Sequence, residues 1–294
     1  MGKLVINEGF LQQIETLQTL IKNNIAGLFG GNHQSKTFGS SCEFSDYREY
    51  QPGDDVSKID WKAYARFDKL YQKLYLDERQ MHTRIYIDAS RSMDYGEGHK
   101  AEQALKLAAA FAYMSVCEMD KVSIYAIKDK TVQELVVGMR GKDAYIAGIG
   151  ALNSLEFSGD SYITDALIPT NVGMGDGMSI IISDFLTDND YERAIHHLVD
   201  KKRDVLCLQI LSREELNPQA RGKMHFFDSE DLEKTYRKHI DKEIIQAYRM
   251  ALAYVTDKVK NCCASRGANY MLVGAEDKLA QVFFGNFVDI GVLK

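Results

Sequence analysis

The most constraining feature of this sequence is a regular alternation between apolar, β-branched runs and longer stretches with helical periodicity. The expected strands are short and nearly continuous in apolar residues: 85–88, 122–127, 179–183, 205–211 and 270–273. The expected helices cover residues 100–119, 142–155, 163–171, 190–202 and 241–264. Such alternation is typical of a parallel sheet that is covered by helices on both faces. We therefore predict an α/β fold with a doubly wound, mostly parallel sheet, and an antiparallel edge strand at residues 131–137.

The first 80 residues do not follow this alternation. Residues 6–28 carry apolar side chains at three- and four-residue steps, which predicts one amphipathic helix. Its stripe consists of Phe10, Ile14, Leu17, Ile21 and Ile25. We expect the stripe to be buried against the body of the chain, with a partner surface as the alternative. Residues 32–77 are irregular, with a short strand expected near 70–76. We thus expect an N-terminal segment, residues 1–80, packed on a main domain of residues 81–294.

Composition narrows the possible classes of function. Lys+Arg number 36 and Asp+Glu number 42, so the formal net charge of −6 argues against a general nucleic-acid-binding protein. No apolar run approaches the roughly 18 residues that a membrane-spanning helix needs, and the N-terminus lacks the apolar core of a signal peptide. The chain has 5 cysteines, two of them adjacent at Cys262 and Cys263, which fits neither a disulfide framework nor a zinc site. We expect a cytoplasmic protein with reduced thiols.

A carboxylate and two hydroxyls follow the first expected strand of the main domain. Asp88, Ser90 and Ser92 occupy alternate positions of the pentapeptide at residues 88–92. Hard oxygen ligands of this kind suit Mg²⁺, which prefers octahedral oxygen coordination. Open α/β sheets bind ligands at the carboxyl ends of their strands, where this pentapeptide is placed. The motif therefore predicts a magnesium site at that edge of the sheet.

Two further turns place polar side chains at the same edge. Asp184 follows the expected strand 179–183, and residues 159–164 open another helix with hydroxyl side chains. Together these turns provide two carboxylates and several hydroxyls for one cation. The alternative interpretation is that Ser90, Ser92 and Asp184 only cap the helices that follow them.

These residues resemble a known kind of metal site. The Asp88-x-Ser90-x-Ser92 motif, a helix-opening hydroxyl and Asp184 resemble the metal-ion-dependent adhesion site of von Willebrand factor A-like domains. The resemblance implies the metal ligands Asp88, Ser90, Ser92, Ser161 and Asp184, with Mg²⁺ or Mn²⁺ as the ion. In the loop that opens the helix after residue 159, the family usually has a Thr six residues before the Leu of an Ala-Leu pair. Here the count from Ala166-Leu167 leads to Ser161, with Thr164 as the alternative.

A second resemblance covers nearly the whole chain. The stretch 43–55, followed by Ile59-Asp60-Trp61-Lys62 and Ala65-Arg66, resembles the signature of a bacterial family called domain of unknown function fifty-eight. In that family the signature precedes a von Willebrand A-like domain, as it does here. Members are commonly encoded beside MoxR-type AAA+ ATPases and are thought to act with them as adaptors. The resemblance thus implies a non-enzymatic, metal-dependent protein-binding adaptor for protein maturation or complex assembly, with the ATPase and a client protein as partners.

Two other functions stay open. A metal-dependent phosphoryl-transfer enzyme would use Asp88 as nucleophile, although enzymes of the haloacid-dehalogenase type normally have a second Asp where Ser90 stands. The sequence contains no Gly-x-Ser-x-Gly elbow and no phosphate-binding Gly-x-x-x-x-Gly-Lys-Ser/Thr loop. The third function is a metal-free scaffold, in which residues 88–92 only shape a turn.

The signature stretch itself has a structural interpretation. Pro52-Gly53 is typical of the centre of a type II turn. Trp61 and Ile59 are expected to be buried as a structural clasp, with a partner surface as the alternative. Asp54 and Asp55 form a charged tip whose role stays open. Four cations of the stretch are near enough in sequence to pair with its acids: Arg48, Lys58, Lys62 and Arg66.

Overall fold

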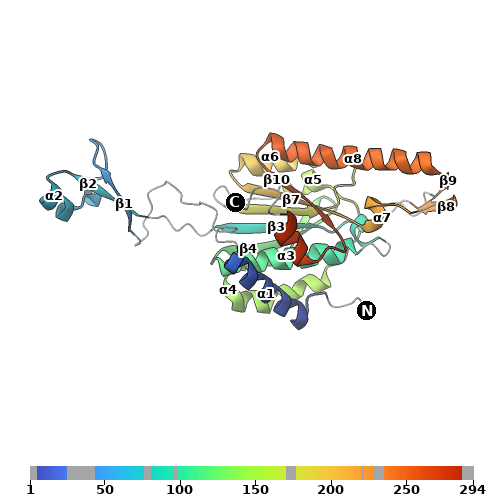
Figure 1. Ribbon diagram of the computed structural model, residues 1–294, viewed down its shortest axis with the longest axis horizontal. Helices are drawn as coiled ribbons and strands as arrows, with labels where there is room; N and C mark the ends of the chain where they lie inside the picture. Colours follow the sequence, from blue (N-terminus) through green and yellow to red (C-terminus); the bar gives the residue numbers. More distant parts are fainter. Residues whose placement is uncertain are drawn as a thin grey trace. The chain divides into compact units, whose positions relative to one another are not determined.

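The chain forms two compact units. The computed structural model describes residues 5–24, 44–75, 81–95, 99–169, 177–219, 222–227 and 235–286. The larger unit comprises Met1–Phe29 and Met81–Lys294, and the smaller unit comprises Gly30–Gln80 (Figure 1). The N-terminal helix therefore belongs to the same unit as the main sheet. The smaller unit is inserted in the sequence between that helix and the first strand of the sheet.

A six-stranded sheet organises the larger unit, in the order β10-β7-β6-β3-β4-β5. Its strands are β3 (His82–Asp88), β4 (Lys121–Lys128), β5 (Thr131–Met139), β6 (Met178–Ser183), β7 (Asp204–Leu211) and β10 (Asn269–Gly274). Neighbouring strands are parallel except for β5, which pairs with β4 in antiparallel register at one edge. The predicted α/β class, the mostly parallel sheet and the antiparallel edge strand are confirmed.

Helices cover both faces of this sheet, as Figure 1 shows. One face is covered by α1 (Glu8–Asn24), α3 (Lys100–Cys117), α4 (Gly141–Gly148), the adjoining 3-10 turn Ile149–Ser154, and the C-terminal turns Leu279–Gln281 (α9) and Val282–Asn286 (η4). The other face is covered by α5 (Ile163–Leu167), α6 (Glu192–Asp200) and α8 (Lys242–Ser265). Alternate residues of β3 point to opposite faces, so Ile85 and Ile87 lie in one core and Tyr86 in the other.

The N-terminal helix packs on the sheet-bearing unit, as the apolar stripe predicted. Phe10, Ile14 and Leu17 are buried in the same core as Phe111 of α3. The start of α1 is also tied to the 3-10 turn Ile149–Ser154, because Asn153 bonds to both the N–H and the C=O of Ile6. The core interpretation of this stripe is confirmed for these three residues. Residues 25–28 of the predicted helix lie outside the described residues.

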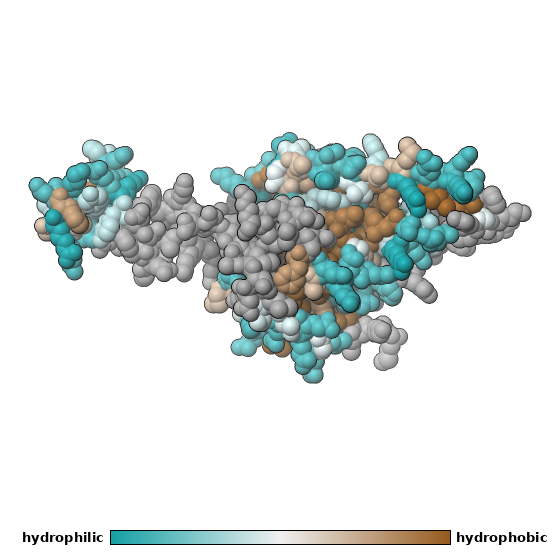
Figure 2. Space-filling view, viewed as in Figure 1, coloured by the Kyte–Doolittle hydropathy of each residue, from teal (hydrophilic) through white to brown (hydrophobic). Residues whose placement is uncertain are grey.

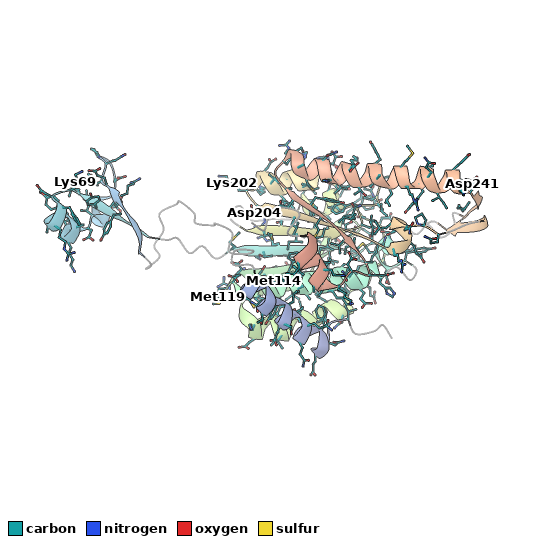
Figure 3. The ribbon with its side chains drawn as sticks, in the orientation of Figure 1. Lys69, Met114, Met119, Lys202, Asp204 and Asp241 are labelled. Atoms are coloured by element: carbon teal, nitrogen blue, oxygen red, sulfur yellow. The ribbon has the colours of Figure 1, made fainter. Side chains whose placement is uncertain are left out.

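The two ends of the sheet differ in what surrounds them. Met119 and Lys202 precede β4 and β7 and lie at the amino edge, whereas Asp241 caps α8 at the opposite end (Figure 3). Between β7 and α8 the chain forms a short helix α7 (Arg213–Leu216) and a hairpin of β8 (Gly222–Phe227) and β9 (Thr235–Ile240). The surface over α8 mixes polar and apolar residues in Figure 2, and Met250 and Tyr254 are among the exposed large residues of this helix. None of the helices in the described part of the chain is both long and apolar enough to cross a membrane.

The smaller unit is built on a two-stranded antiparallel sheet. It contains β1 (Phe44–Glu49), a 3-10 turn (Val56–Lys58), α2 (Trp61–Phe67) and β2 (Tyr71–Tyr75). The predicted type II turn is present, because Gly53 has φ of 106° and the Asp54 N–H donates to the Gln51 carbonyl. Asp54 also pairs with Arg48 at 2.8 Å, and Asp55 caps the 3-10 turn.

The expected burial of Trp61 is wrong. Its side chain is 63% exposed, while Ile59 is buried as predicted. The reason is the helix that the sequence analysis did not foresee. Asp60 caps α2 by accepting from the N–H groups of Lys62 and Ala63, so Trp61 is the first helical residue. Ala63, two positions on, is the residue of α2 that is buried, which leaves Trp61 on the outer side.

Candidate metal centre

The candidate centre lies where the order of the strands reverses. From β3 the chain proceeds outward through β4 to β5 on one side, and through β6 and β7 to β10 on the other. In open α/β sheets, the crevice beyond the carboxyl ends of the two strands at such a switch point is the usual place for a ligand. Asp88 is the last residue of β3, and Ser183 is the last residue of β6.

The carboxylate of Asp88 is the centre of a hydrogen-bond cluster. It is fully buried, and its Oδ2 accepts from the hydroxyls of Ser161 at 2.7 Å and Ser183 at 2.6 Å. Its Oδ1 accepts from the N–H of Ser90 at 3.0 Å. Three segments distant in sequence thus meet on one carboxylate.

The hydroxyls of the pentapeptide face each other next to this carboxylate. Ser90 Oγ and Ser92 Oγ are 3.2 Å apart, and Ser92 is partly exposed whereas Ser90 is buried. Two oxygens that are neighbours in an octahedron with Mg–O distances of about 2.1 Å lie about 3.0 Å apart. The two hydroxyls are hydrogen-bonded to each other, and their spacing is also close to that of two adjacent Mg²⁺ ligands. Ser90 begins a 3-10 turn without a side-chain capping bond, so its hydroxyl is not used as a cap.

Ser161 reaches the centre because a glycine turns the chain. Gly159 has φ of 80°, and a Cβ there would collide with the carboxylate of Asp129. The same carboxylate accepts from the N–H of Asp160 at 3.0 Å, and the Gly159 carbonyl accepts from the N–H of Arg91. The alternative hydroxyl, that of Thr164, accepts instead from the N–H of Ala194 in α6. The structure therefore brings Ser161 to Asp88 and places Thr164 in the core.

The second carboxylate, Asp184, is held by a buried lysine. Lys100 at the start of α3 donates to Asp184 Oδ2 at 2.8 Å and to Glu215 Oε1 at 2.6 Å. The side chain of Lys100 is 4% exposed and that of Asp184 is 2% exposed. Asp184 Oδ1 also accepts from the N–H of Leu186, so a local turn-forming role is present beside the ion pair. Phe185 between them has φ of 53°, which non-glycine residues rarely adopt.

Burial and charge determine the protonation of the cluster. Burial raises the pKa of Asp88, and the nearby charge of Asp184 raises it further, against the hydrogen bonds from Ser183, Ser161 and Ser90. Burial lowers the pKa of Lys100, but Asp184 and Glu215 raise it by more, so Lys100 stays charged. With all groups ionised, three carboxylates and one ammonium give −3 + 1 = −2.

These residues fit a divalent cation. The donor set consists of oxygens, which Mg²⁺ and Mn²⁺ favour. A charge of +2 would balance the cluster, and the hydroxyl pair has the appropriate spacing. Among the described residues, no three His, Cys, Asp or Glu side chains form a group that could hold a metal ion, so an ion here would depend on the serine hydroxyls. Ser90, Ser92 and Ser161 would hold the ion, with Asp88 and Asp184 supplying negative charge.

Sequence reasoning missed three residues of this cluster: Ser183, Lys100 and Glu215. Ser183 ends a strand one residue before Asp184 and points to the opposite side of the chain. A signal for Glu215 was available, since Ser212 and Glu215 form a capping box directly after β7, at the same edge of the sheet. Lys100 had no such signal, because a lysine in the first turn of an expected helix normally faces solvent.

Solved structures to which the chain is similar in fold include the SpRpn10 VWA domain. It shares 11% identity with this chain at a TM-score of 0.37, over 69% of this chain and 92% of that domain. The pilus adhesin SpaC from Lactobacillus rhamnosus GG shares 12% identity at a TM-score of 0.33, over 65% of this chain and 31% of the adhesin. Both are similarities of fold.

Relatives by sequence come from mycobacteria. Uncharacterized proteins of Mycobacterium bovis and Mycobacterium tuberculosis are 24% identical over 224 residues, which are 74% of this chain and 70% of each relative. The profile of the family described as "Protein of unknown function DUF58" matches residues 46–258. This match includes the signature stretch from residue 46 onward, the hydroxyl pair and Asp184, and it covers well over half of the sequence. The chain therefore belongs to the DUF58 family.

Proposed function

We propose that this protein is a metal-dependent, non-enzymatic adaptor that binds a partner protein and acts with a MoxR-type AAA+ ATPase. The observation that carries the proposal is the hydroxyl pair of Ser90 and Ser92, spaced 3.2 Å apart beside the buried carboxylate of Asp88. A Mg²⁺ ion at this place would offer a free coordination position to an acidic side chain of the partner. The ATPase and the client follow from the family resemblance, in protein maturation or complex assembly.

Each residue has a part in this proposal. Ser90, Ser92 and Ser161 supply neutral oxygens, which leave the ion enough positive charge to attract a partner carboxylate. Asp88 orients Ser161 and Ser183 through their hydroxyl protons. The partial exposure of Ser92 gives a partner access to the outer side of the cluster.

The phosphoryl-transfer alternative has less support. An attacking carboxylate needs a free oxygen that faces the substrate. Both oxygens of Asp88 accept hydrogen bonds from within the protein, and the residue is fully buried. A metal-free scaffold is the second candidate, and one observation favours it. Lys100 already neutralises part of the charge of Asp184 and Glu215 without any metal.

Calorimetry with Mg²⁺ and Mn²⁺ tests the proposal. We expect saturable heat for the unaltered protein and none for Asp88→Ala, with a largely intact fold by circular dichroism. Asp94→Ala is the matched control, because Asp94 is an exposed carboxylate in the same loop. Absence of heat in the unaltered protein would favour the scaffold.

A pull-down from the native host separates the remaining functions. The ATPase should be retained with Mg²⁺ present, and released by a chelator or by Asp88→Ala. A parallel assay with p-nitrophenyl phosphate addresses the enzyme alternative. Turnover that disappears in Asp88→Asn would overturn the adaptor proposal.

A further inference from the structure

The smaller unit has a hollow beside α2 that is lined by aromatic rings and cations. Its volume is about 470 Å³, and the lining includes Tyr47, Asp60, Lys62, Arg66, Phe67 and Tyr71. The ring centroids of Phe67 and Tyr71 are 6.3 Å apart, and those of Tyr47 and Tyr71 are 6.1 Å apart. We call this site the α2 hollow. The rings form a connected apolar wall that does not belong to the core of the unit.

Several aromatic side chains at and beside this site are exposed. Phe67 is 66% exposed, and Tyr47 and Tyr64 are exposed as well. Trp61, Tyr64 and Phe67 follow each other at three-residue steps along α2. They form a row of aromatic side chains on one side of the helix, and this row ends at the hollow. Exposed aromatic residues that gather in this way are typical of protein-binding surfaces, where Trp, Tyr and Arg contribute most of the binding energy.

Two cations at the same site form no ion pair with any acid among the described residues. Lys62 and Arg66 are four residues apart on α2, so they are neighbours on one side of the helix. In the part of the chain that the structure describes, neither forms an ion pair. Lys69 differs, because it pairs with Glu49 at 3.4 Å. Asp60 is occupied otherwise, since it caps α2 and accepts from the Tyr47 hydroxyl at 2.8 Å. The α2 hollow thus combines an apolar wall with two unpaired positive charges.

We propose that the α2 hollow binds an acidic peptide segment of a partner protein, anchored by an aromatic or large aliphatic side chain. The anchor would pack against Tyr47, Phe67 and Tyr71, and the carboxylates would pair with Lys62 and Arg66. Charge complementarity favours this partner, because the rim of the hollow is cationic while its wall is apolar. A nucleic acid fits less well, since two unpaired cations are few for a phosphate backbone and the chain has a net charge of −6.

Binding of a defined peptide tests this site independently of the metal centre. The probe is fluorescein-labelled Glu-Glu-Leu-Phe-Glu-Glu, measured by fluorescence anisotropy with the full-length protein in EDTA. We expect saturable binding that weakens at high salt, because exposed charges are screened. Phe67→Ala and Arg66→Gln should each weaken binding about tenfold, as loss of a central interface residue does. Because EDTA removes divalent cations, the result does not depend on whether the metal centre binds an ion.

Two control variants are matched to these changes. Val56→Ala removes an exposed apolar side chain of the same unit, and Lys69→Gln removes a positive charge just beyond α2. Both should bind within about twofold of the unaltered protein, since neither residue lines the hollow. Equal affinities for all four variants, or no saturable binding, would overturn the proposal. Tighter binding of a labelled dodecathymidylate, lost in the same two variants, would assign the site to nucleic acid instead.

Discussion

Lys100 supplies a positive charge inside the candidate centre. In a metal site, the charge of the carboxylates would ordinarily be balanced by the ion alone. Its ammonium contacts both Asp184 and Glu215, and the side chain is almost fully buried. A buried ion pair of this kind adds little net stability compared with apolar packing, but removal of one partner is costly. Lys100 also reduces the charge of the cluster to a value that one divalent cation balances. We therefore expect Lys100 to couple the stability of the fold to the binding of a cation at the proposed centre.

Replacement of this lysine should be strongly destabilising. Lys100→Met leaves the buried carboxylate of Asp184 without its counter-ion, so we expect the free energy of unfolding to fall by about 3–5 kcal/mol in EDTA. Mg²⁺ should restore part of this loss, because a divalent cation compensates the same charge. Urea denaturation with and without Mg²⁺ measures both effects. Lys106→Met on the same helix is the control, since its pair with Glu102 is partly exposed and should contribute less than about 1 kcal/mol.

Asp88 should make the metal-free protein less stable as the pH rises. Its pKa in the folded state is raised above the ordinary 3.8, chiefly by burial. The folded state therefore binds the proton more tightly than the unfolded state, and this contribution to stability is complete below pH 3.8. It is lost as the pH increases through the raised pKa. Asparagine cannot ionise, so Asp88→Asn does not lose this stability. The unfolding temperature of Asp88→Asn relative to that of the unaltered protein should therefore rise with pH. A constant difference between the two proteins across pH 4–8 would contradict the assignment.

At the scale of elements, α1 shows how a helix distant in sequence becomes part of the core. Ile14 is 1% exposed and lies in the same apolar cluster as residues of α3. Ile14→Ala should therefore cost about 2–5 kcal/mol, because it leaves a cavity among side chains that cannot fully collapse. Gln13→Ala changes the neighbouring exposed residue and should alter stability by less than about 0.5 kcal/mol. Chemical denaturation of both variants measures these changes in the free energy of unfolding. It thereby distinguishes a helix that is part of the core from one that only rests on the surface of the larger unit.

The main sheet was predictable from sequence because its strands are buried on both faces. Nearly continuous apolar runs such as residues 205–211, which only Gln209 interrupts, are typical of strands buried on both faces, and β7 covers Asp204–Leu211. The hairpin of β8 and β9 was not predictable, because its strands mix charged and apolar residues and pair only with each other. For Trp61, a single tryptophan two residues after an isoleucine suggested burial. The capping bond of Asp60 starts a helix there and turns the indole outward.

The candidate centre was predictable to the extent that its residues follow strands. Asp88 and Asp184 come directly after apolar runs, so the topology of a parallel sheet alone brings them to one edge. The contacts of Lys100 and Glu215 could not be derived in this way. The position of Glu215 has a local signal, the capping box with Ser212 directly after β7, whereas its contact with Lys100 depends on the tertiary packing of α3, which no local pattern encodes.

At the scale of the whole molecule, the sheet-bearing unit is discontinuous in the sequence. The sheet-bearing unit begins with Met1–Phe29, is interrupted by Gly30–Gln80 and resumes at Met81. An N-terminal boundary near residue 80 would therefore divide α1 from the core that buries it. The two units also carry different proposed sites, the metal centre in the larger one and the α2 hollow in the smaller one. The two functions should be separable by excision.

Excision of residues 30–80 should leave the larger unit folded and able to bind Mg²⁺. With a flexible Gly/Ser linker in their place, α1 can still reach its position, and closing such a loop costs only about 0.6 kcal/mol per doubling of length. We expect an unfolding transition as cooperative as that of the full chain, the same calorimetric heat with Mg²⁺, and no binding of the acidic peptide. Truncation of residues 1–80 is the informative comparison, since it also removes Phe10, Ile14 and Leu17 and exposes the core surface that they cover. That truncated protein should aggregate or unfold at a clearly lower temperature. If the truncated protein were instead as stable as the excised form, α1 would not be part of the core. Its apolar stripe would then be better explained as a surface that binds a partner.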